Sequence, residues 1–276
     1  MFLNKIGIMQ GRLSKPESKA IQSFPTQSWQ NEFIKAKKLS IKFIEWTLDY
    51  KNLHKNPLLT NHGIRKIRYL TKKYNIKVKS ITGDCFMQKP FWQEENAKKR
   101  EILIKDLKKI LNCASILKIR YIVIPLVDKG SLKKMKHEKI LVSELMKFKN
   151  FLLKKRMFIL FETDFPPKKN LNFIKIFNSK NFGFNYDIGN SASLDYDPVK
   201  EFRHFGKYIK NVHIKDRKKY GKTVQLGEGN ANYRNISKLF KKIKYKGNFI
   251  LQTARGFPGK ELENISKNLT FLKQYQ

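Results

Sequence analysis

Short apolar runs alternate along the chain with longer stretches in which apolar residues recur at helical spacing. The runs are rich in β-branched and aromatic residues, and they predict strands over 5–9, 41–46, 76–82, 120–125, 157–162, 182–187, 209–214 and 248–252. The intervening stretches predict helices near 28–39, 60–74, 93–117, 137–155, 168–178, 198–206, 232–244 and 260–274. The clearest helix is 93–117, where an apolar stripe lies opposite lysines.

Eight strand-then-helix units in this order predict a closed parallel (β/α)8 TIM barrel of the α/β class. The strand runs are nearly continuous in apolar residues, as expected for parallel strands buried on both faces. The length of 276 residues fits one such barrel. We find no Gly-rich nucleotide-binding motif after an early strand and no linker-like segment. We therefore expect a single domain over residues 1–276.

The composition is strongly basic, with 59 Lys and Arg against 22 Asp and Glu and a formal net charge of +37. Such a charge suits nucleic-acid or anionic-membrane binding. However, only ten of the basic residues are Arg, and the lysines are spread over almost every segment. This distribution indicates that lysine is simply the most frequent surface residue. We therefore expect no specific nucleic acid and no membrane as partner. The positive field would still attract a small anionic substrate.

The two cysteines, Cys85 and Cys113, form neither a CxxC motif nor a disulfide framework. The segment Met1 to Gln10 lacks the long apolar core of a signal peptide. The apolar runs are also too short to span a bilayer. From these features we expect a cytoplasmic protein with reduced thiols.

Polar side chains end four consecutive strands in the second half of the chain: Glu162, Asp187, His213 and Gln252. In a barrel these strand ends meet at one face, where barrel enzymes keep their chemistry. Glu, Asp and His together suit one divalent ion such as Mn²⁺, Co²⁺, Mg²⁺ or Zn²⁺, and no cysteine joins them. Each residue also has a structural interpretation: a rim ion pair for Glu162, a turn for Asp187, a core histidine for His213, and a hydrogen bond for Gln252.

Several motifs in the chain resemble those of the xylose isomerase-like TIM barrel superfamily, in its sugar-phosphate isomerase/epimerase branch. They are Gly7-Ile8-Met9-Gln10-Gly11-Arg12-Leu13-Ser14, Ile44-Glu45-Trp46, Glu162-Thr163-Asp164, Asp187-Ile188-Gly189-Asn190, Val212-His213-Ile214-Lys215-Asp216 and Leu226-Gly227-Glu228-Gly229. They run from the first strand nearly to the last. Singly the motifs are weak, and their order along eight units is what makes them specific.

The resemblance implies a metal-dependent isomerase or epimerase that acts on a small sugar or sugar phosphate through an enediolate. One divalent ion is held in such enzymes by Glu, Asp, His and Glu from strands 5 to 8, so Glu162, Asp187, His213 and Gln252 are the expected ligands. The two glutamates of the family exchange protons with the substrate, which makes Glu162 the principal base here. Relatives are often dimers or tetramers, which leaves a homo-oligomer open.

The sequence departs from the family pattern at three positions. Gln252 stands where the second Glu is expected, Asn190 where many relatives have His, and Lys168 where some have another Glu. An amide cannot exchange a proton as a carboxylate does, so both catalysis and ligation by Gln252 need testing. The candidate substitutes for the missing acid or base are Glu45, Asp84, Lys215 and Glu228.

Several residues beside strand ends are candidates for contacts with the substrate. Arg12, Lys215, Arg217 and Arg255 could clamp an anionic group, because Arg holds phosphate or carboxylate bidentately. Glu45, Trp46, Asp84 and Glu228 complete the predicted pocket, although an aromatic ring at this position more often serves packing. The loop from Gly11 to Gln27 follows the first strand and is a candidate lid.

Three alternative functions remain open. Gln252 favours a one-base reaction on a related polyol, such as a lyase or dehydratase step. The related DNA-repair branch, with AP endonuclease-like activity, uses a trinuclear zinc cluster with many histidines, whereas this chain has five. A non-catalytic sugar-binding barrel would keep the pocket and lose the chemistry.

Overall fold

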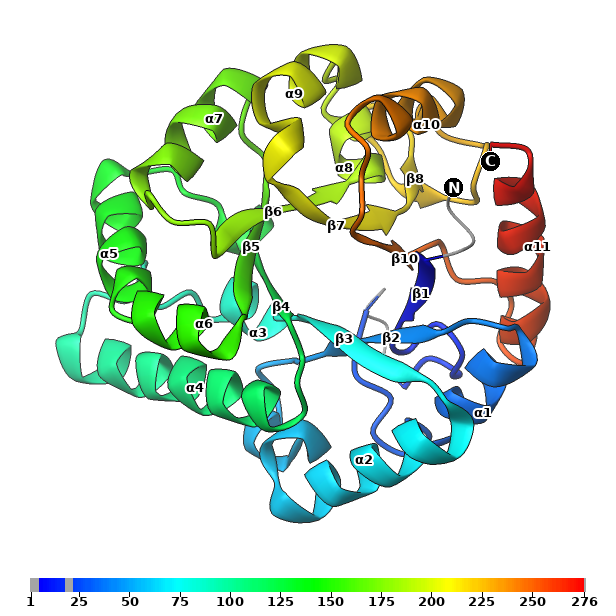
Figure 1. The fold of residues 1–276 in the computed structure, drawn as a ribbon, viewed down its shortest axis with the longest axis horizontal. Helices are drawn as coiled ribbons and strands as arrows, with labels where there is room; N and C mark the ends of the chain where they lie inside the picture. The colour runs from blue at the N-terminus through cyan, green and yellow to red at the C-terminus, as the bar shows by residue number, and fades with distance from the viewer. Residues whose placement is uncertain (1–4, 18–21, 276) are drawn as a thin grey trace.

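The computed structural model describes residues 5–17 and 22–275, which form a closed barrel of eight parallel strands surrounded by helices (Figure 1). Each strand pairs with its neighbour along the chain, and the last strand closes the ring against the first. The barrel strands are β1 (Ile6–Met9), β2 (Phe43–Thr47), β3 (Lys77–Thr82), β4 (Tyr121–Leu126), β5 (Phe158–Thr163), β6 (Phe182–Asp187), β7 (Ile209–Ile214) and β10 (Asn248–Leu251). The predicted fold class is confirmed.

The helices pack outside the barrel. They are α1 (Asn31–Lys38), α2 (Asn61–Tyr74), α3 (Asp84–Gln88), α4 (Ala97–Ile116), α5 (Met135–Met146), α6 (Lys149–Lys155), α7 (Pro167–Ile176), α8 (Ile188–Ser193), α9 (Pro198–Phe205), α10 (Tyr233–Lys242) and α11 (Glu261–Lys273). The helix expected from residue 93 begins at Ala97, because the Asn96 side chain accepts a hydrogen bond from the Lys99 N–H and caps it.

One predicted helix was wrong: residues 137–155 form two helices, α5 and α6, and not one. The Phe148 N–H donates to the Leu145 carbonyl, three residues back, so the chain forms a tighter turn between the two helices. Leu145 and Leu152 are nevertheless both fully buried. The apolar pattern therefore continues across a break that periodicity alone does not reveal.

Short elements that the pattern did not predict follow three of the strands. Helices α3 and α8 come directly after β3 and β6, and a two-stranded antiparallel hairpin, β8 (Asp216–Arg217) with β9 (Thr223–Val224), follows β7. Because all three follow the carboxyl ends of strands, they lie around that end of the barrel. No helix among the described residues is long and apolar enough to cross a membrane.

The core has two parts of different character. Between barrel and helices, the rings of Phe161, Phe173, Phe177 and Phe182 pack at centroid distances of 4.4–6.2 Å. Inside the barrel, by contrast, polar side chains are fully or almost fully buried, including Glu45, Asn185, Asn211 and His213. Barrel interiors are usually filled by branched apolar residues, so this polar layer needs hydrogen-bond partners from several strands at once.

Candidate metal centre

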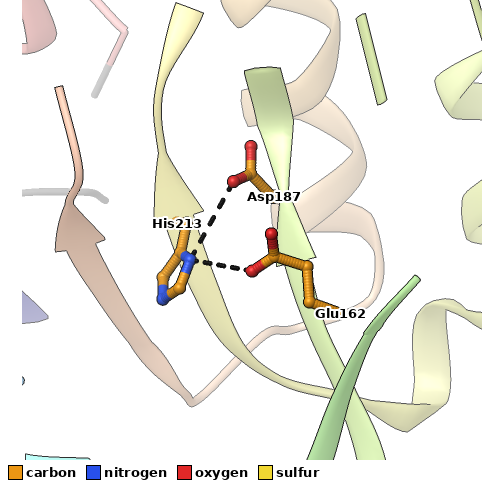
Figure 2. A group of neighbouring side chains, drawn as sticks. All are labelled: Glu162, Asp187 and His213. Carbon is orange, nitrogen blue, oxygen red and sulfur yellow. Dashed lines mark ion pairs between the residues drawn. The ribbon is translucent and has the colours of Figure 1, made fainter. Parts of the chain in front are cut away.

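Three buried side chains meet at the carboxyl end of the barrel (Figure 2). Glu162 is in β5, Asp187 ends β6 and His213 is in β7, and one ligand atom from each lies within 4.8 Å of the others. The His213 Nδ1 is 3.1 Å from Glu162 Oε2 and 3.9 Å from Asp187 Oδ2. A nitrogen and two carboxylate oxygens this close together form a suitable donor set for a divalent cation.

The other ring nitrogen of His213 is held by the carboxylate of Glu45. Its Nε2 is 2.6 Å from Glu45 Oε1, and Glu45 Oε2 accepts a hydrogen bond of 2.9 Å from Asn211 Nδ2. Glu45 and His213 are both fully buried. Histidine ligands commonly have a carboxylate on the nitrogen that does not bind the metal, and this partner sets the ring orientation and tautomer. Glu45 therefore directs Nδ1 towards Glu162 and Asp187.

The charges of the centre compensate one another. Burial by itself lowers the pKa of His213, but the Glu45 charge and the contacts with Glu162 outweigh it and raise the pKa to about 10. Burial raises the pKa of Glu162, yet His213 and then Lys215 bring it below its ordinary value. Burial raises the pKa of Asp187, which Lys215 Nζ only partly offsets at 2.7 Å from Oδ2. Carboxylates that need cations in this way fit a metal site.

Gln252 supplies the best test of whether the residues suit a metal ion. It directly follows β10, and its backbone N–H donates to the Ile214 carbonyl, which places it beside the end of β7. Its Nε2 donates to Gln22 Oε1 at 3.2 Å, whereas its Oε1 is buried and accepts no hydrogen bond from the described residues. A buried oxygen without a donor is costly unless a cation or another ligand satisfies it. The cluster of Glu162, Asp187 and His213 therefore fits a bound divalent ion, and the Gln252 oxygen could take a further ligand bond.

Asn190 completes the surroundings of the candidate base. Its Nδ2 donates to Glu162 Oε1 at 2.7 Å, and its backbone N–H donates to Asp187 Oδ1 at 2.8 Å. Asn185, in β6, donates to the other Glu162 oxygen at 2.8 Å. Both oxygens of Glu162 are thus oriented by amides before any ligand binds.

A cleft of about 660 Å³ opens above this centre. The predicted site residues that line it are Arg12, Asp84, Glu162, Lys215, Arg217 and Gln252. This volume is in the range of small-molecule sites, which run from about 300 to 1,000 Å³. The cleft therefore joins residues from the ends or following loops of β1, β3, β5, β7 and β10.

The remaining predicted substrate contacts lie outside the cleft lining. Glu45 lies beneath the centre, and Trp46 is fully buried, with its Nε1 donating to Asn56 Oδ1 at 2.9 Å. The Arg255 Nη1 donates to the Gly11 carbonyl at 2.6 Å, so it fastens the loop after β1. Glu228 is exposed, in a loop whose backbone N–H groups bind the Asp216 carboxylate. A direct substrate contact by these four stays a prediction.

The basic groups of the cleft are already held in place. Arg12 is 4% exposed, and its Nε donates to the Thr253 carbonyl at 2.8 Å. Burial first, and then the Arg255 charge, lower the pKa of Arg12 to about 9. The Arg217 Nη1 donates to Asn190 Oδ1 at 2.8 Å, which ties it to the amide that orients Glu162. These arginines are therefore positioned groups and not freely moving rim charges.

Asp84 is a second carboxyl group of interest in the cleft. It begins α3 directly after β3 and is 8% exposed. Burial, and next the charges of Asp49 and Glu162, raise its pKa to about 7. Two cleft carboxyl groups thus have pKa values shifted in opposite directions, since that of Glu162 is lowered. Such divergence is the usual sign of separate acid and base roles.

The described parts of the candidate lid, residues 11–17 and 22–27, are tied to the barrel, and residues 18–21 lie outside the described residues. The Glu32 carboxylate accepts hydrogen bonds of 2.9 and 3.0 Å from the Gly11 and Leu13 N–H groups. Gln22 joins the cleft and contacts both Gln252 and Arg12. Sequence reasoning missed Gln22, and only its place in the loop after the first strand could have indicated it.

Comparisons with known proteins bear on this arrangement. A family model described as xylose isomerase-like TIM barrel matches residues 33–275. An uncharacterized protein of Methanocaldococcus jannaschii is 30% identical over 112 residues, which are 40% of this chain and 36% of that protein. The match therefore covers little more than a third of that relative.

Solved structures share the fold over nearly the whole chain. D-allulose 3-epimerase from Methylomonas sp. has a TM-score of 0.77 at 14% identity, covering 99% of this chain and 98% of that one. The IOLI protein with a bound zinc atom has a TM-score of 0.76 at 14% identity, covering 99% of each chain. A xylose isomerase-like protein from Mycobacterium smegmatis in complex with magnesium has a TM-score of 0.69 at 15% identity, covering 98% and 96%.

Proposed function

The chain belongs to the xylose isomerase-like TIM barrel family, and on that premise we propose that it is a metal-dependent isomerase or epimerase of a small sugar or sugar phosphate. One observation carries the proposal. Glu162, Asp187 and His213 bring ligand atoms within 4.8 Å of one another, and Glu162 lines a ligand-sized cleft together with Gln252, whose buried Oε1 has no hydrogen-bond partner among the described residues. Two solved structures of the same fold carry zinc and magnesium, and a third is a D-allulose 3-epimerase.

Glu162, Asp187, His213 and Gln252 would hold one divalent ion, of which Mn²⁺, Co²⁺, Mg²⁺ and Zn²⁺ all suit the donor set. Once bound, the ion would polarise the substrate carbonyl and acidify the adjacent C–H. Glu162 would remove that proton. Its lowered pKa keeps it ionised at neutral pH, and Asn185 and Asn190 fix its two oxygens.

Asp84 is the best candidate for the second proton-transfer group. The family's second glutamate is replaced here by Gln252, whose amide cannot exchange a proton. Asp84 lines the same cleft, and its pKa of about 7 allows it to be protonated near neutral pH. A proton taken by Glu162 could then be balanced by one delivered from Asp84.

The cleft also carries the features expected for an anionic substrate. Arg12, Lys215 and Arg217 line it with their orientations already fixed by hydrogen bonds or an ion pair. A phosphate or carboxylate on the sugar would meet a preorganised guanidinium at low entropic cost. A sugar phosphate is therefore favoured over a neutral sugar.

The test combines metal analysis with a substrate panel. Protein loaded with each of the four metals should bind one ion per chain, and Glu162→Gln and His213→Ala should abolish or strongly weaken binding. Glu101→Gln, at an exposed residue paired with Lys105, is the matched control and should change nothing. Ketoses and ketose phosphates in deuterated water should show exchange at one carbon, lost in Glu162→Gln. No bound metal after loading, or full activity in Glu162→Gln, would overturn the proposal.

Gln252 also supports a second candidate, a one-base elimination on a related polyol. The same deuterium experiment separates the two. Inversion or isomerisation with exchange supports the first proposal, whereas loss of water from the substrate supports a dehydratase. If the native protein is inert and Gln252→Glu is active, the barrel has kept its pocket and lost the family reaction.

A further inference from the structure

A second cavity lies at the opposite end of the barrel, where β3, β4 and β10 begin (strands in Figure 1). Its volume is about 530 Å³, which is within the usual range for small-molecule sites. Of the thirteen described residues that line it, seven are Lys or Arg and none is Asp or Glu. It shares no residue with the cleft above the candidate metal centre.

Two of the cations that line the cavity lie on aromatic rings instead of beside carboxylates. The Lys79 Nζ lies 3.6 Å from the centroid of the Phe43 ring. The Arg120 guanidinium lies over the rings of Tyr121 and Phe158, at 5.7 and 5.6 Å. Neither cation takes part in an ion pair within the described residues. Cation–π contacts position a charge without neutralising it, so both charges remain free to meet an anion.

These charges also repel one another. Partial burial first, and then the charges of Lys77, Lys5 and Arg120, lower the pKa of Lys79. Four cations are therefore close enough to interact. A bound anion would relieve the repulsion and the desolvation together.

A neutral donor in the same cavity lacks an acceptor. Asn248 is 5% exposed, and its Nδ2 has no hydrogen-bond partner among the described residues. It lines the cavity together with Lys79 and Arg120. A buried amide N–H without an acceptor is unfavourable, so a ligand oxygen at this place would complete its hydrogen bonding.

We propose that this cavity binds a small molecule that carries one or more phosphate groups. Lys79, Arg120 and Asn248 would receive the phosphate oxygens, and the apolar part of the ligand would pack on Val78 and Leu117, which also line the cavity. Several cations and a planar guanidinium favour phosphate over a single carboxylate. The cationic groups surround a cavity and do not form an open stripe, which favours a small ligand over a nucleic-acid strand.

The test measures binding of two probes, inorganic pyrophosphate and adenosine diphosphate, by isothermal titration calorimetry on the full chain. The double variant Lys79→Gln/Arg120→Gln should weaken binding at least about tenfold, since each charge-assisted contact is worth more than a neutral hydrogen bond. Asn248→Leu should weaken it less. The control Lys98→Gln/Lys154→Gln removes the same charge from exposed positions outside both cavities and should leave the affinity unchanged.

The variant Arg217→Gln tests whether the probes bind instead in the cleft above the candidate metal centre, which Arg217 lines. It should leave binding in the cavity at the amino end of the barrel unchanged. Equal affinity for both probes would support a site for the phosphate group alone, and tighter binding of adenosine diphosphate would support an organic phosphate. Three results would overturn the proposal: neither probe binds, the control pair weakens binding as much as the cavity pair, or only Arg217→Gln weakens it. Circular dichroism at increasing temperature would verify that every variant is folded.

Discussion

The two ends of the barrel differ in how their charged side chains are paired. At the carboxyl end, Lys215 pairs with Asp187 at 2.7 Å and His213 lies between Glu45 and Glu162. At the amino end, Lys79 and Arg120 lie on aromatic rings, with no acid among the described residues that line the cavity. An excess of positive charge in the sequence therefore says little about either site. The local pairing decides which end suits a cation and which suits an anion.

The largest expected effect is at the carboxyl end, where each charge depends on a partner. Glu45→Ala would leave the buried His213 Nε2 without its carboxylate and should lower the free energy of unfolding by about 3–5 kcal/mol, as expected when one partner of a buried pair is removed. Urea unfolding of metal-free protein measures the change. Glu101→Ala, in an exposed pair with Lys105, is the control and should cost at most about 1 kcal/mol.

The isosteric variant Glu45→Gln separates the contribution of Glu45 to the stability of the fold from its role in positioning His213. It should fold, and it should lower metal affinity by about 10- to 100-fold, because partners behind a histidine ligand affect the metal on that scale. If both Glu45 variants bind metal as tightly as the parent, Glu45 does not position His213.

The pH dependence of stability should reveal a buried carboxyl group that forms no ion pair with any cation in the described part of the chain. The buried Glu201 accepts hydrogen bonds from the Tyr186 and Ser191 hydroxyls, and burial raises its pKa from 4.5 to about 7. The folded protein thus favours the protonated form. The stability from this group is fully present below pH 4.5 and is lost as the pH rises through about 7, by up to about 3 kcal/mol.

Glu201→Gln removes this titration and keeps the hydrogen-bond acceptor. The difference in free energy of unfolding between parent and variant should therefore change between about pH 5 and about pH 8, with the parent losing more. Urea titrations across this range measure it, and every other group cancels in the difference. A constant difference would mean that folding does not raise the pKa of Glu201.

A smaller effect is expected from Gln252→Glu. A carboxylate in place of the unpaired amide oxygen should raise metal affinity by about tenfold and should lower the stability of metal-free protein by about 1 kcal/mol, because it adds a negative charge to the cleft that Glu162 and Asp84 also line. Competition with a chelator measures the affinity. Gln252→Asn, which shortens the side chain, should weaken binding. Unchanged affinity in both variants would exclude ligation at this position.

The smallest effect should have the opposite sign and occur at the amino end. Lys79→Met keeps the chain length and removes a charge that three neighbouring cations repel. It should stabilise the protein by about 0.5–1 kcal/mol at low salt, with a smaller gain at high salt. Lys154→Met, at an exposed position on α6, should change little. A loss of stability in Lys79→Met would show that its contact with Phe43 outweighs the repulsion.

The barrel could be predicted because each strand is a short apolar run and each unit repeats the pattern. The same repeat of strand and helix placed strand ends at residues 162, 187, 213 and 252. The clustering of Glu162, Asp187 and His213 was therefore expected. The break between α5 and α6, and the hairpin of β8 and β9, could not be predicted. The hairpin is too short to change the periodicity of apolar residues, and the apolar pattern runs without interruption across the break between the two helices.

The hydrogen bonds behind the site were also beyond sequence reasoning. Glu45 lies 168 residues from its partner His213, and Gln22 lies 230 residues from Gln252. Only the closure of the barrel brings such pairs together. Asn185 and Asn211 did leave a signal, because an amide inside an otherwise apolar strand requires a buried partner.

The polar layer inside the barrel has a consequence for assembly. Glu45, Glu162, Asn185 and Asn211 belong to four different strands, and their hydrogen bonds form only when β2, β5, β6 and β7 are all in register. A slip of one residue in any of these strands would turn its polar side chain towards the aromatic layer and leave the others unsatisfied. Closure with a shifted strand is therefore penalised by several groups at once. The layer therefore favours the closed barrel in which the ligand-bearing strand ends are correctly aligned.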